Sequence, residues 1–262
     1  MGILNVTPDS FSDGGRFFDS RKAVERGLQM VEEGADIIDI GGESTRPGAQ
    51  PVSAEEEIRR TIPIVTELKK QPRCLISIDT RHAETARAAV AAGADIINDI
   101  SALADPEMVH VAAETGAGLV LMHMLGTPET MQNNPRYDDV VSRVWNFLEE
   151  RMAFAIERGV APEQIALDPG LGFGKTDEHN LALLNGIPVL AASGRPVLIG
   201  ASRKSFIGRI TGGGMDERLS GSLAVASFSI LRGAHILRVH DVKESCDAAK
   251  LSDRLRAQGN RE

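Results

Sequence analysis

Eight short apolar runs of the sequence end in, or are followed at once by, polar side chains that could bind a ligand or take part in catalysis. Asp79, Asn98 and Asp168 offer two carboxylates and an amide, which suit a planar heterocycle with several N–H donors, such as an aminopyrimidinone ring. The last two runs offer cationic groups that suit a phosphate-like anion. In chain order, the polar residues at the ends of the runs are Asn5, Glu43 with Thr45 and Arg46, Asp79, Asn98, His123, Asp168, Ser202 with Arg203 and Lys204, and Arg238 with His240.

The stretch DPGLGFGK, residues 168–175, places three glycines ahead of a lysine but matches neither common phosphate-binding pattern. A GxxxxGK[ST] loop that ends at Thr176 would need glycine where Pro169 stands, and a GxGxxG pattern would need glycine where Lys175 stands. We therefore expect the glycines to bring the backbone close to a bound ring, with Asp168 as the recognition group and the phosphate bound elsewhere. Lys175 and Thr176 are expected to lead into the next helix.

The polar residues can share one pocket only if the apolar runs lie side by side as strands. Segments with helical spacing separate the runs; in residues 20–34, for example, Ala23, Leu28 and Val31 fall on one face, and Arg21 and Glu25 face water. Eight strands alternating with helices predict a closed (β/α)8 TIM barrel, whose ligand site lies at the C-terminal ends of the strands. The predicted strands cover residues 2–6, 35–40, 74–78, 94–100, 118–122, 164–167, 196–200 and 235–239, and four predicted helices stop at Gly34, Gly93, Gly116 and Gly233.

Length and composition narrow the class of protein. The chain has 262 residues, 42% of them hydrophobic, which fits one large α/β domain, and its formal net charge is −8. It has no long basic run that would suggest a nucleic acid or an anionic membrane as partner, and no apolar run long enough to span a bilayer. Its two cysteines, Cys74 and Cys246, form no disulfide scaffold and belong to no zinc motif, so we expect a reducing cytoplasm.

Eight motifs carry a family resemblance. In this order and on the predicted strands, the chain contains MGILNVTPDSFSDGG, GGESTRPGA, SIDT, INDI, LMHM, DPGLGFGK, SRKSFIG and RVHD. From Met1 to about Asp241 the sequence resembles the dihydropteroate synthase family, which condenses 6-hydroxymethyl-7,8-dihydropterin pyrophosphate with para-aminobenzoate in folate synthesis and is the target of sulfonamides. The resemblance implies a single pterin-binding TIM-barrel domain over residues 1–262, and a homodimer. Family members generally carry residues ahead of the first strand, so it also implies a fragment or an alternative start.

The resemblance also implies roles for individual residues. Loss of pyrophosphate would leave a pterin cation that the aniline nitrogen attacks, with Asp79, Lys204, Arg238 and His240 as the catalytic residues. Asn5 resembles the family's Mg²⁺ contact. The implied contacts are, for the pterin, Asp79, Asn98, Met122, Asp168, Phe173, Lys204 and Arg238; for the pyrophosphate, Asn5, Thr45, Arg46, Arg238 and His240; and for the aminobenzoate, Phe11, Thr45, Pro47, Phe173, Ser202 and Lys204.

Two other functions fit part of this pattern. A pterin-binding barrel that passes a methyl group from methyltetrahydrofolate to a corrinoid protein would share the acids and amides, but it would not need the NVTPDSFSDGG segment or the SRK and RVH anion groups. An inert pterin-binding paralogue is expected to lack Asn5, Lys204, Arg238 or His240, and all four are present.

Four further residues have structural interpretations. Asp39 interrupts an apolar strand and is expected to make a buried hydrogen bond rather than to support the site. His123 either faces the pocket or fills the mouth of the barrel. His235 begins the last strand, at the opposite end of the barrel from the site, so we expect no catalytic role for it. Trp145 lies in a segment of helical spacing and is expected to pack.

The segments NVTPDSFSDGGRF and GGESTRPGAQP are rich in Gly, Pro, Ser, Thr and Asp, and we expect them to form loops over the barrel mouth. If pyrophosphate with Mg²⁺ draws Arg46 and Thr45 inward, the loops create the aminobenzoate site, and a sulfonamide should bind roughly 5-fold to 150-fold more tightly in their presence. Calorimetric titration with and without pyrophosphate and Mg²⁺ measures this. Equal affinity in both conditions contradicts the idea, and loss of the enhancement in Arg46→Ala assigns the coupling to the second segment.

Overall fold

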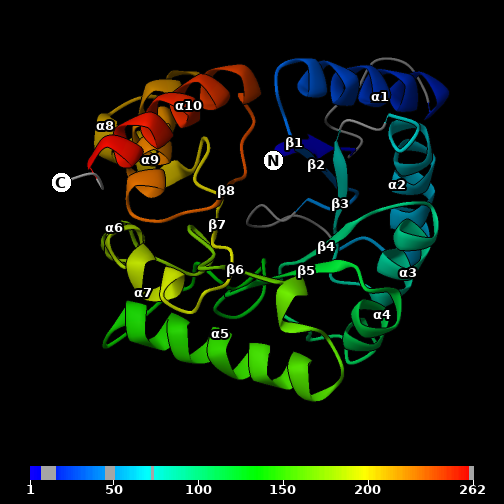
Figure 1. The fold of residues 1–262 in the computed structure, drawn as a ribbon, viewed down its shortest axis with the longest axis horizontal. Helices are drawn as coiled ribbons and strands as arrows, with labels where there is room; N and C mark the ends of the chain where they lie inside the picture. The colour runs from blue at the N-terminus through cyan, green and yellow to red at the C-terminus, as the bar shows by residue number, and fades with distance from the viewer. Residues whose placement is uncertain (7–15, 45–50, 72–73, 260–262) are drawn as a thin grey trace.

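The computed structural model describes residues 1–6, 16–44, 51–71 and 74–259. In this part of the chain, eight strands alternate with helices in the order that the sequence pattern predicts (Figure 1). Each predicted apolar run overlaps one of the strands, and three of the strands extend one residue past the predicted end. The strands are β1 (Gly2–Asn5), β2 (Ile37–Gly41), β3 (Leu75–Asp79), β4 (Ile96–Asp99), β5 (Gly118–Met122), β6 (Ile165–Asp168), β7 (Leu198–Ile199) and β8 (Ile236–Leu237).

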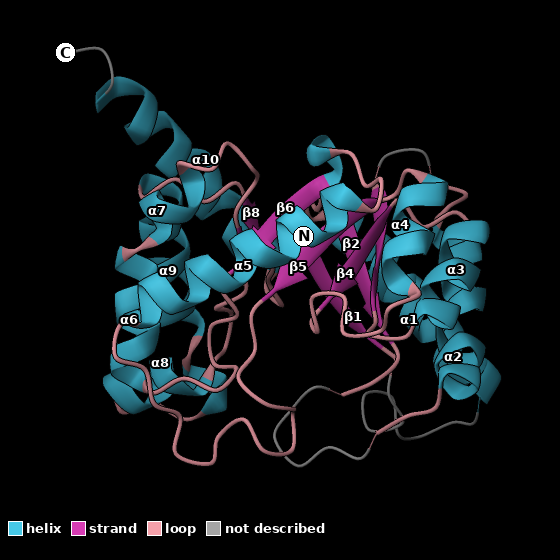
Figure 2. Cartoon of the chain, turned by 90° about the horizontal axis from the view of Figure 1, so that it is seen from below, coloured by secondary structure: helices cyan, strands magenta, loops and turns pink. Residues whose placement is uncertain are grey.

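The helices surround the strands. Figure 2 shows the strands enclosed between α1 to α4 on one side and α6 to α10 on the other. In the described chain the α-helices are α1 (Arg16–Glu32), α2 (Ala54–Leu68), α3 (Ala83–Ala91), α4 (Met108–Thr115), α5 (Val140–Glu157), α6 (Asp177–Asn185), α7 (Ile187–Ala191), α8 (Ser205–Thr211), α9 (Leu219–Leu231) and α10 (Val242–Gly259). Two short 3₁₀ helices, η2 (Pro162–Gln164) and η3 (Met215–Glu217), complete the set.

The parallel sheet closes on itself. Strands β1 to β6 pair in sequence order, and β7 pairs with β8. Two bridges join these sheets: Leu167 faces Val197 between β6 and β7, and Gly2 faces Val239 between β8 and β1. The N–H of Leu167 donates to the carbonyl of Pro196 and the N–H of Ile3 to that of Val239, both at 2.9 Å. The predicted (β/α)8 barrel is therefore closed.

Two apolar layers hold the barrel together. The larger lies between the strands and the helices and includes Ile38, Ile76, Leu121 and Leu167 from the outward faces of four strands. The smaller lies inside the barrel, where Val120, Ala166 and Leu198 pack with Met1, Ile96 and Ile236. Because successive side chains of a strand point to opposite faces, the residues that follow these inner positions by two also point inward.

The local predictions agree with the structure where the chain is described. Gly34, Gly93, Gly116 and Gly233 all have positive φ angles, between 72° and 110°, as expected for glycines that end helices. Trp145 lies in α5 and packs against the core. His235 directly precedes β8, and its Nδ1 accepts from the N–H of Val197 at 3.2 Å, which is a structural contact. No helix in the described part of the chain has the length and apolar character needed to cross a membrane.

Candidate active site

Strand register places polar side chains of neighbouring strands at one level of the barrel. Asn5 of β1 pairs with Gly41 of β2, Gly41 with Asp79 of β3, and Asp79 with Asn98 of β4. Gly41 has no side chain to separate its neighbours: a Cβ built there would lie 3.6 Å from both Asn5 Oδ1 and Asp79 Oδ2. The prediction that strand-end polar residues gather in one place is confirmed for these three.

Arg238, which follows β8, is held between two carboxylates. Its Nε donates to Asp39 Oδ2, and its terminal nitrogen NH2 donates to Asp79 Oδ2, each at 2.6 Å. Asp39 also accepts from Ser77 Oγ at 2.6 Å and from Asn98 Nδ2 at 3.1 Å, and it is fully buried. Asp39 makes the buried hydrogen bonds expected of it, but two of the donors are predicted site residues, so it also orients the site.

Asp168 ends β6 and opens the DPGLGFGK loop. Its Oδ1 accepts from the N–H of Gly170 at 2.7 Å, and the residue is 5% exposed. Gly170, Gly172 and Gly174 have φ angles of 66°, 80° and 67°, in the left-handed region that favours glycine. A Cβ on Gly170 would meet the carbonyl oxygen of His123 at 2.0 Å. Gly170 therefore allows a close approach to the neighbouring loop, and the expected approach of these glycines to a bound ring stays a prediction.

One pocket brings the predicted pterin residues together. Every residue that the resemblance assigned to the pterin lines it. The Nζ of Lys204 lies 4.0 Å from the centre of the Phe173 ring. Ile100 and Leu171 add apolar walls that the sequence patterns did not single out. The lining residues are Asp79, Asn98, Ile100, Met122, Asp168, Gly170, Leu171, Phe173, Gly200, Lys204 and Arg238.

Burial and charge set the protonation of this pocket. Burial raises the pKa of Asp79 to about 7, and Arg238 opposes this rise. Burial also raises the pKa of Asp168, while the Gly170 N–H and the nearby cations lower it. The pKa of Lys204 falls to about 8, chiefly through burial and the charge of Arg238. Burial alone would lower the pKa of Arg238, but Asp39 and Asp79 raise it above its usual value. Arg238 is therefore a permanent cation beside acids with raised pKa values.

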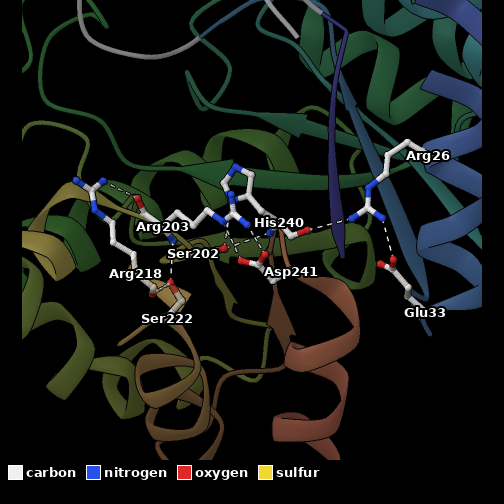
Figure 3. A network of polar contacts seen from close by, with 8 residues as sticks. All are labelled: Arg26, Glu33, Ser202, Arg203, Arg218, Ser222, His240 and Asp241. Atoms are coloured by element: carbon white, nitrogen blue, oxygen red, sulfur yellow. Dashed lines mark hydrogen bonds and ion pairs between the residues drawn. The ribbon is translucent and has the colours of Figure 1, made fainter. Parts of the chain in front are cut away.

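Polar contacts connect the loops after β7 and β8 (Figure 3). Ser202 Oγ accepts from the N–H of His240 and lies 3.1 Å from His240 Nδ1. Arg203, with a φ of 56°, forms an ion pair with Asp241. Burial lowers the pKa of His240 to about 4, with Arg238 and Arg203 adding to this effect. The imidazole is therefore neutral near pH 7. The Ser202 hydroxyl can bond His240 Nδ1 as donor or as acceptor, according to the tautomer of the ring.

The segments after β1 and β2, which carry several predicted site residues, are only partly described. Phe11, Thr45, Arg46 and Pro47 lie outside the described residues, so their assigned contacts remain predictions. Glu43 does not line the pocket; it forms an ion pair with Arg81 at 2.9 Å.

Lys175 and Thr176 lead into α6 as expected, but the sequence did not predict that Lys175 is buried. Thr176 does begin the next helix, since its hydroxyl accepts from the N–H of His179 as the N-cap of α6. Lys175, however, is only 2% exposed, and its Nζ lies 3.0 Å from His123 Nδ1. His123 packs edge-to-face on Phe147 and does not line the pocket, which agrees with the packing alternative. The only sequence feature that could have indicated the buried contacts of Lys175 is its position after three glycines.

Comparison with known proteins places these residues in a family. The family model described as "Pterin binding enzyme" matches residues 1–240. The chain is 49% identical to dihydropteroate synthase of Escherichia coli K12 over 251 residues, which are 96% of this chain and 89% of that protein.

Two solved structures are similar over nearly the whole chain. The Yersinia pestis dihydropteroate synthase in a sulfonamide drug complex has a TM-score of 0.93 and 42% identity, covering 98% of this chain and 94% of that one. The Xanthomonas albilineans enzyme in complex with 7,8-dihydropteroate has a TM-score of 0.89 and 44% identity, covering 98% and 93%. This chain therefore belongs to the dihydropteroate synthase family of pterin-binding transferases, which act in folate biosynthesis.

Proposed function

We propose that this pocket is where the chain joins 6-hydroxymethyl-7,8-dihydropterin pyrophosphate to para-aminobenzoate, with release of pyrophosphate. The observation that carries this proposal is the pocket, which two acids and an amide line together with two cations. The acids and the amide come from β3, β4 and β6, whereas Lys204 and Arg238 follow β7 and β8. A flat ring with N–H donors fits the first group, and a phosphorylated side chain fits the second.

Asp168 is the proposed recognition group for the pterin. One of its oxygens already accepts from the Gly170 N–H, which fixes the carboxylate while leaving lone pairs free. Those lone pairs accept from the 2-amino group and the adjacent ring N–H, a charge-assisted pair. Asn98 binds another ring nitrogen, with its amide held by Asp39. Met122 and Phe173 enclose the faces of the ring.

In this proposal, catalysis is mainly electrostatic stabilisation of the charges that develop in the reaction. Departure of pyrophosphate leaves positive charge on the exocyclic methylene and the ring, and the ionised form of Asp79 stabilises that charge. Arg238 stabilises the departing anion. His240 contributes a hydrogen bond rather than a charge, because its ring is neutral near pH 7. The amine of the aminobenzoate then attacks beside Lys204 and Phe173, and an aniline nitrogen needs little activation for this step.

Asn5 is the proposed protein contact for Mg²⁺. Its amide oxygen lies at the end of β1, across Gly41 from Asp79. Among the described residues, no group of three or more His, Cys, Asp and Glu side chains could hold a metal ion by itself. A site with one amide oxygen fits an ion that keeps several waters and binds mainly through substrate phosphates. When bound, Mg²⁺ would neutralise charge on the pyrophosphate.

We also propose a homodimer and a cytoplasmic location. Large apolar side chains are exposed on successive helices from α8 to α10, among them Ile210, Phe228, Leu231, Leu251 and Leu255. A second copy of the chain would bury such a surface. The location is supported by Cys74 and Cys246, which are both free thiols, and fractionation of producing cells would test it.

Asp168→Asn should abolish most pterin binding. The amide accepts at only one oxygen and carries no charge, so the loss should reach roughly 2 to 5 kcal/mol. Calorimetric titration with 6-hydroxymethylpterin measures it, and Asp138→Asn, on the exposed surface, serves as the matched control. An Asp168→Asn affinity within about threefold of the unaltered protein contradicts the assignment, since that is under 1 kcal/mol.

Carbon–oxygen cleavage should precede attack by the amine. With both substrates present, a coupled assay should detect pyrophosphate release. Without aminobenzoate, an isotope label in the oxygen that joins the methylene carbon to phosphorus should scramble into the non-bridging oxygens of the same phosphate. If no scrambling occurs while an inert acceptor analogue fills the second site, and release always waits for the amine, the stepwise order is wrong.

Sedimentation equilibrium should give a mass near twice the 28.1 kDa of the chain. Replacing Phe228 and Leu231 together by serine should shift the mass toward one copy, because both lie exposed on α9. A single-copy mass for the unaltered protein at micromolar concentration rules the dimer out.

A further inference from the structure

Lys175 is a buried ammonium group that the proposed reaction does not use. It is among the largest side chains that are almost completely buried in the described chain. Its Nζ has three neighbours: His123 Nδ1 at 3.0 Å, the carbonyl of His123 at 3.3 Å and the carbonyl of Phe173 at 2.9 Å. Burying a lysine without a carboxylate at contact distance is costly, so the residue calls for an explanation.

The neighbours of Lys175 match an ammonium group. An ammonium has three N–H donors and no acceptor, and three groups that can accept surround it. A neutral amine would donate to only two of them, and its lone pair would have to accept from His123 with the ring proton on Nδ1. Burial lowers the pKa of His123 to about 3, and the charge of Lys175 adds to this, so the ring is neutral and its Nδ1 can accept. Burial lowers the pKa of Lys175 to about 7, whereas Asp168 acts in the opposite direction.

The contacts of Lys175 join two loops of the pterin pocket. His123 follows β5, and its N–H donates to the carbonyl of Asp168 at 3.1 Å. Phe173 belongs to the loop after β6 and lines the pocket. Lys175 therefore ties the backbone on both sides of Asp168 from a buried position.

Other ties to the same loop carry no charge. The hydroxyl of Tyr137 donates to the carbonyl of Gly174 at 2.9 Å, and Gln132 Nε2 donates to that of Gly172 at 2.7 Å. The N–H of Gly172 donates to Asn180 Oδ1 at 2.7 Å. Lys175 differs from these groups in bringing positive charge close enough to Asp168 to favour its ionised form.

We propose that Lys175 is a positioning residue for pterin binding, which fixes the loop that carries Phe173 and keeps Asp168 ionised before the substrate enters. The proposal rests on the assignment of Asp168 to the pterin. Three cations act on Asp168 in the described structure, Lys204, Arg238 and Lys175. The first two lie in the pocket and meet the substrate directly, so Lys175 is the one whose charge the substrate does not engage.

The sign of the pH effect follows from this charge. Binding needs ionised Asp168, so affinity falls as the pH drops through the pKa of that group. Removing the positive charge of Lys175 raises the pKa of Asp168, and the fall then begins at a higher pH. A merely structural tie would lower the affinity at every pH without moving the fall.

The test is calorimetric titration of 6-hydroxymethylpterin into Lys175→Met and the unaltered protein from about pH 5 to pH 8. Lys175→Met should bind roughly 10-fold to 100-fold more weakly at the upper end, because a displaced loop misplaces the ring. Its fall in affinity should begin at a higher pH than in the unaltered protein, as expected for loss of a nearby opposite charge. Coincident normalised pH profiles overturn the proposal.

Tyr137→Phe is the matched control, because it removes a hydrogen bond from the same loop without removing a charge. Its profile should keep the unaltered pH midpoint, and an equal shift in this variant overturns the charge assignment. If Asp168→Asn binds the pterin normally, the pterin assignment itself has failed. If Asp168→Asn binds poorly and the Lys175→Met profile is unshifted, only the role of Lys175 is wrong.

Circular dichroism and thermal melting show whether Lys175→Met folds. If Lys175→Met does not fold, Lys175→Gln takes its place, because glutamine keeps an N–H donor but not the charge. The same shift in the pH profile is expected for this variant. A measurement on the unaltered protein is independent of both variants: nuclear magnetic resonance of lysine labelled at Cε should show a charged, protected lysine near pH 7 in the pterin complex. A neutral Lys175 there overturns the proposal.

Discussion

The ion pairs of Arg238 with Asp39 and Asp79 are the interactions on which the rest of the site depends. Arg238 is 199 residues from Asp39 in sequence and 159 from Asp79. The strand that precedes it, β8, has only two residues, so this side chain links the last strand to β2 and β3 across the barrel. Losing one partner of such a buried pair typically costs about 3 to 5 kcal/mol, because the other charge is left uncompensated. The contacts that help close the barrel thus also orient Asn98 and Asp79 in the pocket.

The sequence predicts the outline of this site well because a parallel barrel imposes a simple geometry. Strand ends that are far apart in sequence meet at one rim, so Asp79, Asn98, Asp168 and Arg238 could be grouped from their positions alone. Gly41 could not, since its role is to be small between Asn5 and Asp79, and only the register reveals that. The positions of Phe11, Thr45, Arg46 and Pro47 remain predictions, since they lie outside the described residues.

Asp39 and Lys175 show why the supporting residues were harder to predict. Each is a charged side chain beside apolar or glycine-rich sequence, and local sequence favours a structural interpretation for both. What decides their roles is the set of partners from other strands and loops, which are Arg238 and Asn98 for Asp39 and His123 for Lys175. No helical or strand period encodes such contacts.

The described site has equal numbers of acidic and cationic side chains, and the two kinds come from different parts of the barrel. Three acids, Asp39, Asp79 and Asp168, come from β2, β3 and β6, and two of the three cations, Lys204 and Arg238, follow β7 and β8. The third, Lys175, is buried and does not line the pocket. A substrate with N–H donors at one end and an anion at the other therefore meets complementary charge in only one orientation. His240 is neutral near pH 7, whereas Arg238 keeps its charge and is held in place by Asp39 and Asp79.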